Sequence, residues 1–358
     1  ASAFDGACRH RGIAYNSTAL NPTPPRPLRS PQPGAAADGK PAPFETERGT
    51  GGAVSILVCT FRRPEGLTRL LESLGKLQWR RERPPRVEVV VVDNDPAGAA
   101  KPVCESARAT CSLDIRYVKE PRHGIPYARN ASVAAMAADA TYCVFVDDDE
   151  TVEPLWLDEL LRVAEAERAD VVAGRVEARF LAVAPKWVER GGFHQQTRFP
   201  TGATLDRAYT NNTLVCCEAL RAMPALFDER MQFSGGSDTH FFRRMYRAGF
   251  RIVSADDAIV YDWFPESRMT ARWIWQRAFR IGASSAFIER DFCGRWGAAP
   301  VCLAVGGYRV LKGIVTIPLG LLGFERFVRA VRHVCYGAGL ISGWFGVKYG
   351  EYRRVHGE

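Results

Sequence analysis

The sequence predicts an α/β fold built on a mostly parallel, doubly wound β-sheet. Short, continuous apolar runs such as 54–59 and 87–92 recur along the chain, and a strand buried on both faces of a sheet has this composition. Segments with the apolar spacing of helices separate these runs, and strands that alternate with helices form parallel sheets. Ligands of such sheets bind beyond the carboxyl ends of the strands. Polar residues at those ends are therefore the first candidates for a functional site.

The predicted elements follow one another along the chain. The first strand, 54–59, ends before Thr60, and Pro64 suits the first turn of the helix that follows. The leucines of 67–74 recur at helical spacing and form one apolar stripe. After the second strand, 87–92, the pattern predicts strands at 114–118, 142–146 and 171–176, with helices at 129–138 and from 157 onward.

The 358-residue chain has the composition of a globular protein. Hydrophobic residues make up 46% and charged residues 25%, which excludes a wholly disordered chain. The net charge of +8 favours polyanionic partners, and nucleic acid, anionic lipid and diphosphate substrates all fit it. The ten cysteines are scattered without a Cys-x-x-Cys pair, which favours a reduced, cytosolic setting over a disulfide framework.

Both ends differ in composition from the predicted globular domain, 53–290. Residues 1–52 are rich in Pro, Gly and Ala and predict a disordered tail, because they offer few large apolar side chains to bury. Residues 291–358 are apolar and basic, and the apolar stretch 313–324 is shorter than the roughly 20 residues that a spanning helix needs. A membrane-surface segment and a helical hairpin with a solvated basic face both fit this extension.

A run of three aspartates follows the predicted strand 142–146. Side chains alternate along an extended chain, so Asp147 and Asp149 point to the same side. Two converging carboxylates repel each other unless a cation lies between them, and Mg²⁺ or Mn²⁺ accepts such oxygen ligands. A solvated acidic loop before the next helix is the alternative. The position directly after a buried strand favours the metal site.

Two further groups lie where a strand ends or a helix begins. Asp93 could accept a hydrogen bond from a nucleobase N–H, although an ordinary Asx turn before Pro96 is the simpler interpretation. Arg129 and Asn130 fall in the first turn of a predicted helix, where backbone N–H groups attract anions. Helix capping by Asn130 is the alternative there.

The segment 233–240 predicts a glycine-rich turn that leads into another helix. Asp238 lies at the start of this helix, where it can present a carboxylate to a cleft or act as an ordinary N-cap. A later helix, 270–281, carries Arg277 and Arg280 on one face. That face fits diphosphate binding as well as an ordinary solvated surface.

Together these motifs resemble the family 2 glycosyltransferases, which have the GT-A fold, and especially bacterial exopolysaccharide glucosyltransferases of the succinoglycan type. The resemblance covers about 53–285 and implies a Rossmann-like nucleotide-binding half fused to an acceptor half. The end of the chain, 337–357, is similar to the membrane-associated tails of such enzymes. The motifs that carry the resemblance are VSILVCTFRRP, VVVVDNDP, HGIPYARN, VFVDDDE, FSGGSDTHFFRRMYRAGF and WIWQRAFRIG.

The resemblance implies a metal-dependent, inverting enzyme that transfers one sugar, expected to be glucose, from a UDP-sugar. The acceptor would be a hydroxyl of a saccharide or a lipid-linked saccharide. Asp238 would be the general base, and Asp147 and Asp149 would hold the metal as the pair of the DxD motif. Asp262 would replace the histidine that many relatives use as a further ligand. The implied contacts to the nucleotide sugar are Thr60, Arg62, Asp93, Arg129, Asp147, Asp148, Arg277 and Arg280.

One departure from the family pattern bears on the product. Processive synthases carry a Gln-x-x-Arg-Trp element, whereas no Trp follows Arg280 in the segment 276–280 of this chain. This departure indicates the addition of a single sugar rather than polymerisation.

Three other functions fit parts of the sequence. A sugar nucleotidylyltransferase would carry a Gly-rich loop after its first strand, and 60–64 contains no glycine. A non-catalytic membrane scaffold that binds nucleotide sugars has no need for all of Asp147, Asp149 and Asp238. Nucleic acid is not an expected partner, because neither zinc-ligand spacing nor an RNA-binding motif is present. The expected location is the cytoplasmic face of the inner membrane, on the membrane surface.

Overall fold

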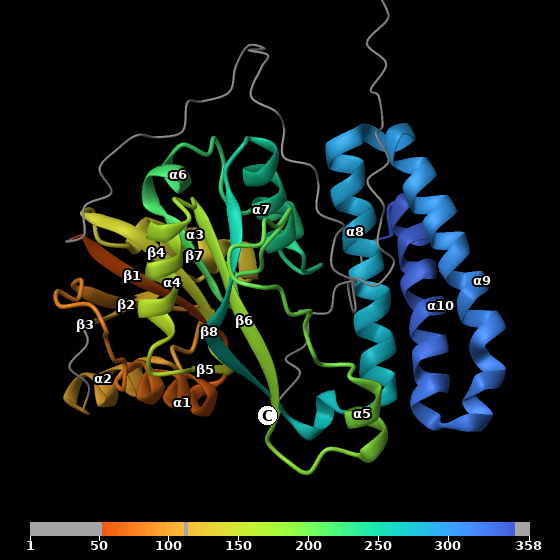
Figure 1. Cartoon of the computed structure of the whole chain (residues 1–358), viewed down its shortest axis with the longest axis horizontal. Coiled ribbons are helices and arrows are strands. Elements are labelled where there is room, and N and C mark those ends of the chain that lie inside the picture. The colour runs from red at the N-terminus through yellow and green to blue at the C-terminus, as the bar shows by residue number, and fades with distance from the viewer. Residues whose placement is uncertain (1–51, 111–113, 348–358) are drawn as a thin grey trace, which may run out of the picture.

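A single eight-stranded sheet forms the centre of the computed structural model, which describes residues 52–110 and 114–347 (Figure 1). Apart from residue 52, the predicted tail lies outside these residues. The strand order is β3-β2-β1-β4-β7-β6-β8-β5. The strands are β1 Ala53–Thr60, β2 Val87–Asp93, β3 Asp114–Lys119, β4 Ala140–Asp147, β5 Glu150–Val152, β6 Val171–Phe180, β7 Thr213–Cys216 and β8 Ile252–Phe264.

The first half of the sheet is parallel, as the apolar runs predict. β1 lies between β2 and β4, and its side chains are almost completely buried. The register pairs Thr60 with Asp93 and Cys59 with Asp147. The polar residues that end three separate runs therefore lie side by side at one edge of the sheet.

The second half of the sheet mixes directions. β7 runs antiparallel to both β4 and β6, whereas β6 and β8 are parallel. The short β5 pairs antiparallel with β8 and places Glu150 opposite Asp262. This pairing brings a residue from the aspartate run next to a residue more than a hundred positions further along the chain.

Helices pack around the sheet and extend beyond it on one side (Figure 1). The predicted helix 129–138 is misplaced. It begins at Ile125, because Gly124 breaks the chain before it with a φ of 144° and Pro126 suits a first turn, and it ends at Ala135. The helices are α1 Pro64–Leu74, α2 Lys101–Thr110, α3 Ile125–Ala135, α4 Trp156–Ala166, α5 Lys186–Gly191, α6 Cys217–Arg221, α7 Ser237–Arg247, α8 Ala271–Ala299, α9 Gly306–Thr316 and α10 Phe324–Trp344.

Three long helices, α8, α9 and α10, stand side by side next to the sheet (Figure 1). α8 is much longer than the predicted helix 270–281, and the predicted domain boundary at residue 290 falls inside it, close to a break at Gly294. A helical stretch, 271–322, is long and apolar enough to cross a membrane by length and composition alone. Phe264 and Trp273 pack against Val328 of α10 and join this helical unit to the sheet domain.

α8 and α10 approach each other through glycines. A Cβ on Gly282 would lie 2.2 Å from the carbonyl oxygen of Tyr336, and a Cβ on Gly339 would lie 2.2 Å from that of Phe279. Real Cβ atoms do not come this close to a backbone oxygen. The two helices can therefore keep this spacing only if both positions lack a side chain.

We predict that Gly339→Ala destabilises the protein by about 1–3 kcal/mol, because the added methyl group forces the two helices apart. Thermal unfolding followed by near-ultraviolet circular dichroism measures the change. Gly307→Ala is the matched control, since an added Cβ there meets nothing within 4 Å. Alanine at that helical position should be neutral or stabilising by roughly 0.5–1 kcal/mol. Equal effects of the two substitutions would contradict the close packing.

Candidate active site

Loops from distant parts of the chain meet at the carboxyl edge of the parallel strands. The His123 ring lies between Phe61, which follows β1, and Phe233, which precedes α7, with centroid distances of 4.7 and 5.4 Å. Asn94, at the end of β2, accepts a hydrogen bond of 2.8 Å from the backbone N–H of Gly124. These contacts bring four of the sequence motifs to one place.

Asp147 is the last residue of β4, and its side chain lies half-buried at this edge of the sheet. The pKa of its carboxyl is raised to about 7, chiefly by burial and also by the charges of Asp149, Asp148 and Asp238, against the lowering effect of Arg129. The charges of Asp149 and Asp238 therefore both act on Asp147. The three aspartates that the sequence singles out share one electrostatic environment.

Asp149 is held by two arginines. Its Oδ2 accepts hydrogen bonds of 2.9 Å from Arg63 Nη1 and 3.0 Å from Arg268 Nη1. Burial alone would raise the pKa of this carboxyl, but the two guanidinium groups hold it below its usual value. Arg63 Nη1 also donates to Asp148 Oδ1 at 2.9 Å. Asp149 is therefore a carboxylate at neutral pH, as a metal ligand must be.

Asp262 and Glu150 face each other across β8 and β5. One oxygen of each, Asp262 Oδ1 and Glu150 Oε1, is buried without a hydrogen-bond partner. Burial raises the pKa of Asp262 to about 7, and the charges of Asp149 and Asp147 raise it as well. Burial and the charge of Asp147 also raise the pKa of Glu150. Oxygen ligands with orphaned lone pairs and mutual repulsion fit a hard divalent cation.

Asp238 is the second residue of α7, where the sequence predicts a helix start. The turn before it uses Gly235 and Gly236 at positive φ, and Gly236, not Asp238, is the N-cap. Arg129 Nη1 donates a 3.0 Å hydrogen bond to Ser237 Oγ. This bond ties the first turn of α7 to α3 and fixes the position of the neighbouring Asp238.

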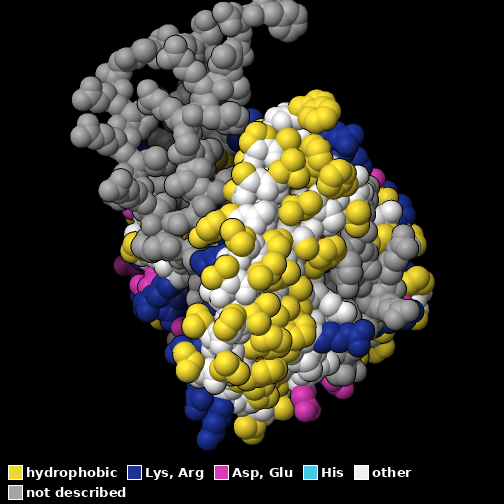
Figure 2. Space-filling model, turned by 90° about the vertical axis from the view of Figure 1, so that its right-hand side faces the viewer, with side chains coloured by type: hydrophobic (Ala, Val, Ile, Leu, Met, Phe, Trp, Pro, Cys, Tyr) yellow, Lys and Arg dark blue, Asp and Glu magenta, His cyan; other side chains and the backbone are white. Residues whose placement is uncertain are grey.

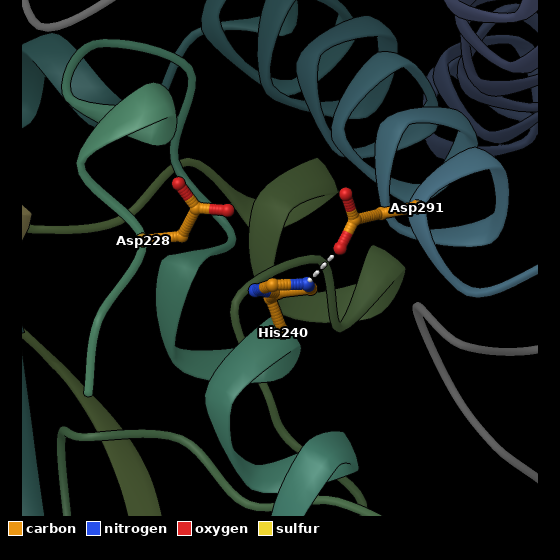
Figure 3. Close-up of side chains that lie close together, drawn as sticks. All are labelled: Asp228, His240 and Asp291. Carbon is orange, nitrogen blue, oxygen red and sulfur yellow. Dashed lines mark hydrogen bonds and ion pairs between the residues drawn. The ribbon is translucent and has the colours of Figure 1, made fainter. Parts of the chain in front are cut away.

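A second contact holds α7 against α8 (Figure 3). His240 Nε2 lies 2.9 Å from Asp291 Oδ2, and Arg230 makes ion pairs with both Asp228 and Asp291. Asp228, His240 and Asp291 each offer one ligand atom within 4.8 Å of the others. Because Arg230 already neutralises both carboxylates, we interpret this cluster as an anchor for α7. The sequence analysis did not single it out.

Most of the residues predicted to contact the nucleoside already form hydrogen bonds within the chain. Thr60 Oγ1 donates to Asp148 Oδ2 at 2.8 Å. Asp93 is fully buried and forms the Asx turn, accepting from Asp95 N at 2.9 Å and from Ala100 N at 3.0 Å. A base contact by Asp93 would require one of these bonds to be given up. Arg62 is exposed and donates to Asp95 Oδ1 at 3.2 Å.

The predicted roles of the α3 motif need one correction. Arg129 and Asn130 lie in the second turn of α3, not the first, so neither caps the helix. Asn130 instead exchanges two hydrogen bonds of 3.0 Å with the backbone of Phe227. On α8, Arg277 lies within electrostatic reach of Asp262 and over the ring of Trp273. Arg280 follows one turn further along the helix.

Several residues of the site went unrecognised in the sequence. Arg63 stands beside Arg62 in the same motif, and the positive φ of 55° at Arg62 turns the chain so that the second arginine reaches the aspartates. Glu150 extends the aspartate run, but its pairing with β8 runs through the three-residue β5 and left no sequence signal. Arg268 lies outside every motif and carried no signal either.

Comparison with known proteins agrees with this geometry. The model of the glycosyl transferase family 2 matches residues 55–229. The succinoglycan biosynthesis protein ExoM of Rhizobium meliloti (strain 1021) is 33% identical over 298 residues, which are 82% of this chain and 94% of that protein. The chain belongs to glycosyl transferase family 2. It is therefore a glycosyltransferase, and the nucleotidylyltransferase and scaffold alternatives are set aside.

The fold agrees with the family. The mannosyltransferase PcManGT from Pyrobaculum calidifontis, solved with GDP-Man and Mn²⁺, is 15% identical with a TM-score of 0.56. The match covers 87% of this chain and 92% of that one. The GT-A fold predicted for this glycosyltransferase is confirmed.

We predict that Asp147 and Asp262 stabilise the metal-free protein less as the pH rises from about 4 to about 7. Folding raises the pKa of both carboxyls above the unfolded value, so the protons that they hold in the folded state leave over this range. Burial lowers the pKa of His194 and His333 to about 4, which acts in the opposite direction, so the effect is measured as a difference between two proteins. In thermal melts the wild type should lose stability relative to Asp262→Asn over this pH range.

Addition of a divalent metal should offset the stability that Asp147 and Asp262 lose as the pH rises. Mn²⁺ is expected to raise the melting temperature more at about pH 8 than at about pH 6, because the ligands must be deprotonated. Asp262→Asn should reduce this gain, whereas Asp257→Asn, an exposed carboxyl outside the site, should keep it. A chelator should remove the gain from the wild type. A gain unaffected by Asp262→Asn would rule out Asp262 as a ligand.

Proposed function

We propose that this glycosyltransferase is metal-dependent and inverting, and that it transfers a single sugar from a UDP-sugar, with glucose as the first candidate. The acceptor is a hydroxyl of a saccharide or lipid-linked saccharide in exopolysaccharide assembly. The single observation that carries the proposal is the 3.0 Å hydrogen bond from Arg129 to Ser237, because Ser237 precedes the candidate base Asp238 and the charge of Arg129 also acts on Asp147 of the acidic cluster. The similarity to a succinoglycan biosynthesis protein supports the pathway.

Asp238 is the proposed general base. It takes the proton of the acceptor hydroxyl while the hydroxyl oxygen bonds to the anomeric carbon and the bond to the departing diphosphate breaks on the opposite side. One such displacement inverts the anomeric configuration. Asp238 Oδ1 already accepts from Thr239 N at 2.7 Å, which leaves the other oxygen for the acceptor. The N-terminus of α7 stabilises the carboxylate form that this role requires.

The acidic cluster is the proposed diphosphate end of the site. Asp147, Asp149 and Asp262 would hold Mg²⁺ or Mn²⁺, which supplies Lewis-acid neutralisation of the charge on the diphosphate. Fixed positive charge comes from Arg63 and Arg268 at the cluster and from Arg277 and Arg280 on α8.

For the nucleoside we propose two kinds of residue. Thr60 and Asp93 hold the ends of β1 and β2 in place through their internal hydrogen bonds. Arg62, which is exposed, and Arg129, which is next to α7, supply the contacts to the nucleotide. A screen of nucleotide sugars for metal-dependent release of free nucleoside diphosphate, with membranes as the source of acceptor, identifies the donor and tests the function.

We predict that Asp238→Asn lowers turnover by about 10²–10⁴-fold, the usual contribution of a general base. The amide cannot accept the proton but keeps the size of the side chain, so donor affinity should change little. Steady-state kinetics with saturating donor, together with nucleotide binding by calorimetry, separate the two effects. Asp257→Asn serves as the control and should leave both unchanged. Near-normal turnover of Asp238→Asn would overturn its assignment as the base.

We also propose that the segment from residue 291 onward attaches the enzyme to the membrane surface. α9 has an inverted pattern, because Arg309 faces the protein interior while apolar side chains face outward. Figure 2 shows a long apolar stripe on this side of the molecule. In water the apolar outer face of such a helix stays exposed and contributes little to stability. The helix is stabilised when this face enters lipid. The outward apolar residues of α9 and of the segments on either side of it are Leu303, Tyr308, Leu311, Ile314, Val315, Leu319, Leu321, Leu322 and Phe324.

Basic residues near this stripe support attachment to an anionic surface. Lys312 lies on α9 itself, and Arg326 and Arg329 lie on the first turns of α10. Positive side chains beside an apolar face are attracted to acidic headgroups. For an enzyme that consumes nucleotide sugars, the cytoplasmic face of the inner membrane is the proposed location.

We predict that the double substitution Leu311→Glu, Val315→Glu weakens binding to anionic liposomes by about 100-fold or more. Each large apolar side chain contributes about 1.5 kcal/mol or more when buried, and each 1.4 kcal/mol is tenfold in affinity. Co-sedimentation measures the change. Val183→Glu is the control, since Val183 is 97% exposed on the sheet domain. Unchanged sedimentation of the double variant would contradict the proposed membrane face.

A further inference from the structure

Positively charged side chains gather where α9 meets α10. Arg309 Nη1 lies 2.7 Å from His333 Nδ1, and Arg309 also lies over the ring of Tyr336 at 5.1 Å. Arg332 lies over the ring of Phe193 at 5.5 Å. The cluster, hereafter the basic cluster, consists of Arg309, Lys312, Arg329, Arg332 and His333.

The two central arginines are buried without a counter-charge. Arg309 is 3% exposed and Arg332 is 7% exposed, and the Nε atom of each is buried without a hydrogen-bond partner. Within residues 52–110 and 114–347, no carboxylate forms an ion pair with either of them. A buried cation is ordinarily paired, because taking its charge out of water is costly. The described residues therefore leave both arginines in need of an anionic partner.

Electrostatics within the cluster agree with this interpretation. Burial, together with the charges of Arg329 and Arg309, lowers the pKa of Arg332 to about 10. Burial and four neighbouring cations likewise lower the pKa of His333 to about 4. Lys312 and His333 are half-buried and Arg329 is exposed, so the cluster opens to the surface on one side.

The basic cluster is connected to the candidate active site through the packing of α10, α8 and α7. Arg309 lies over the ring of Tyr336, whose backbone oxygen closely approaches Gly282 of α8. Ser284, two residues further along α8, packs against Gly236, the N-cap of α7. The proposed base is the second residue of α7. The basic cluster and the proposed base therefore adjoin the same turn of α8.

We infer that the basic cluster binds the phosphate of a lipid-linked acceptor, whose hydrocarbon chain lies along the apolar face of α9 and whose saccharide extends toward Asp238. This inference rests on the proposed function, because it names the acceptor of that reaction. Guanidinium groups match phosphate oxygens in paired hydrogen bonds, and several cations together suit a diphosphate better than a single carboxylate. The adjoining apolar stripe fits a ligand that is both anionic and lipidic (Figure 2).

The test measures binding of the full chain to three kinds of vesicle. Phosphatidylcholine vesicles are compared with vesicles that also contain a polyprenyl diphosphate, and with vesicles that contain phosphatidylglycerol at equal charge. We expect the polyprenyl diphosphate to increase binding about tenfold or more over phosphatidylcholine. The double variant Arg309→Gln, Arg332→Gln should lose this increase, whereas Arg83→Gln, an exposed arginine of the sheet domain, should keep it.

Each result decides one part of the inference. Equal increases with phosphatidylglycerol would assign the cluster to ordinary phospholipid and overturn the acceptor assignment. An increase that survives in the double variant would overturn the site itself. If the double variant does not fold, nuclear magnetic resonance of the wild type replaces it. A soluble short-chain prenyl diphosphate should raise the pKa of the His333 ring, and an unchanged titration of that ring would overturn the site.

The vesicle assay requires no turnover, so it is independent of the proposed chemistry. Asp238→Asn should bind the vesicles as the wild type does. A failure of the base assignment therefore leaves the binding result interpretable, and a failure of vesicle binding leaves the donor assay unaffected.

Discussion

The repulsion among carboxylates at one edge of the sheet is the constraint around which the rest of the site is arranged. Asp147, Asp149, Glu150 and Asp262 are drawn together by strand ends and by the pairing of β5 with β8. Arginines from three separate segments offset their charge: Arg63 after β1, Arg129 in α3 and Arg268 before α8. These attractions between arginines and carboxylates therefore hold together segments that lie apart in the sequence. This arrangement underlies the proposed binding of a divalent cation and a diphosphate.

The sequence predicts the parallel half of the fold well, because a strand buried on both faces must be almost wholly apolar. It does not reveal β5 and β7, which contain three and four residues and are too short for a pattern. It also leaves out β8, because Asp256 and Asp257 interrupt the apolar run of this 13-residue strand. The aspartates were found because they end such runs. Arg63 was passed over in favour of Arg62, since only the backbone turn at Arg62 decides which of two adjacent arginines faces inward. Arg268 could not be found at all, because its partner, Asp149, is distant in the chain.

The C-terminal helices are not a separate appendage. α8 begins beside the carboxylates, where Arg277 lies near Asp262, and it continues into the unit that packs on α10 through Gly282 and Gly339. The same element therefore contributes to the proposed donor site and supports the proposed membrane-facing surface. The inverted pattern of α9 could not be interpreted from sequence alone, because burial of Arg309 depends on which side of the helix meets α10.

The two-residue spacing between Asp238 and His240 has a consequence for how this enzyme can be studied. Successive residues of a helix are rotated by about 100°, so these two side chains leave α7 in nearly opposite directions. One direction holds the proposed base, and the other holds the attachment to Asp291. The proposed chemistry and the packing of α7 are thus separated within a single helical turn. A chemically silent version of the protein should remain able to capture both of its substrates at once, which makes the complete ternary assembly accessible to crystallisation.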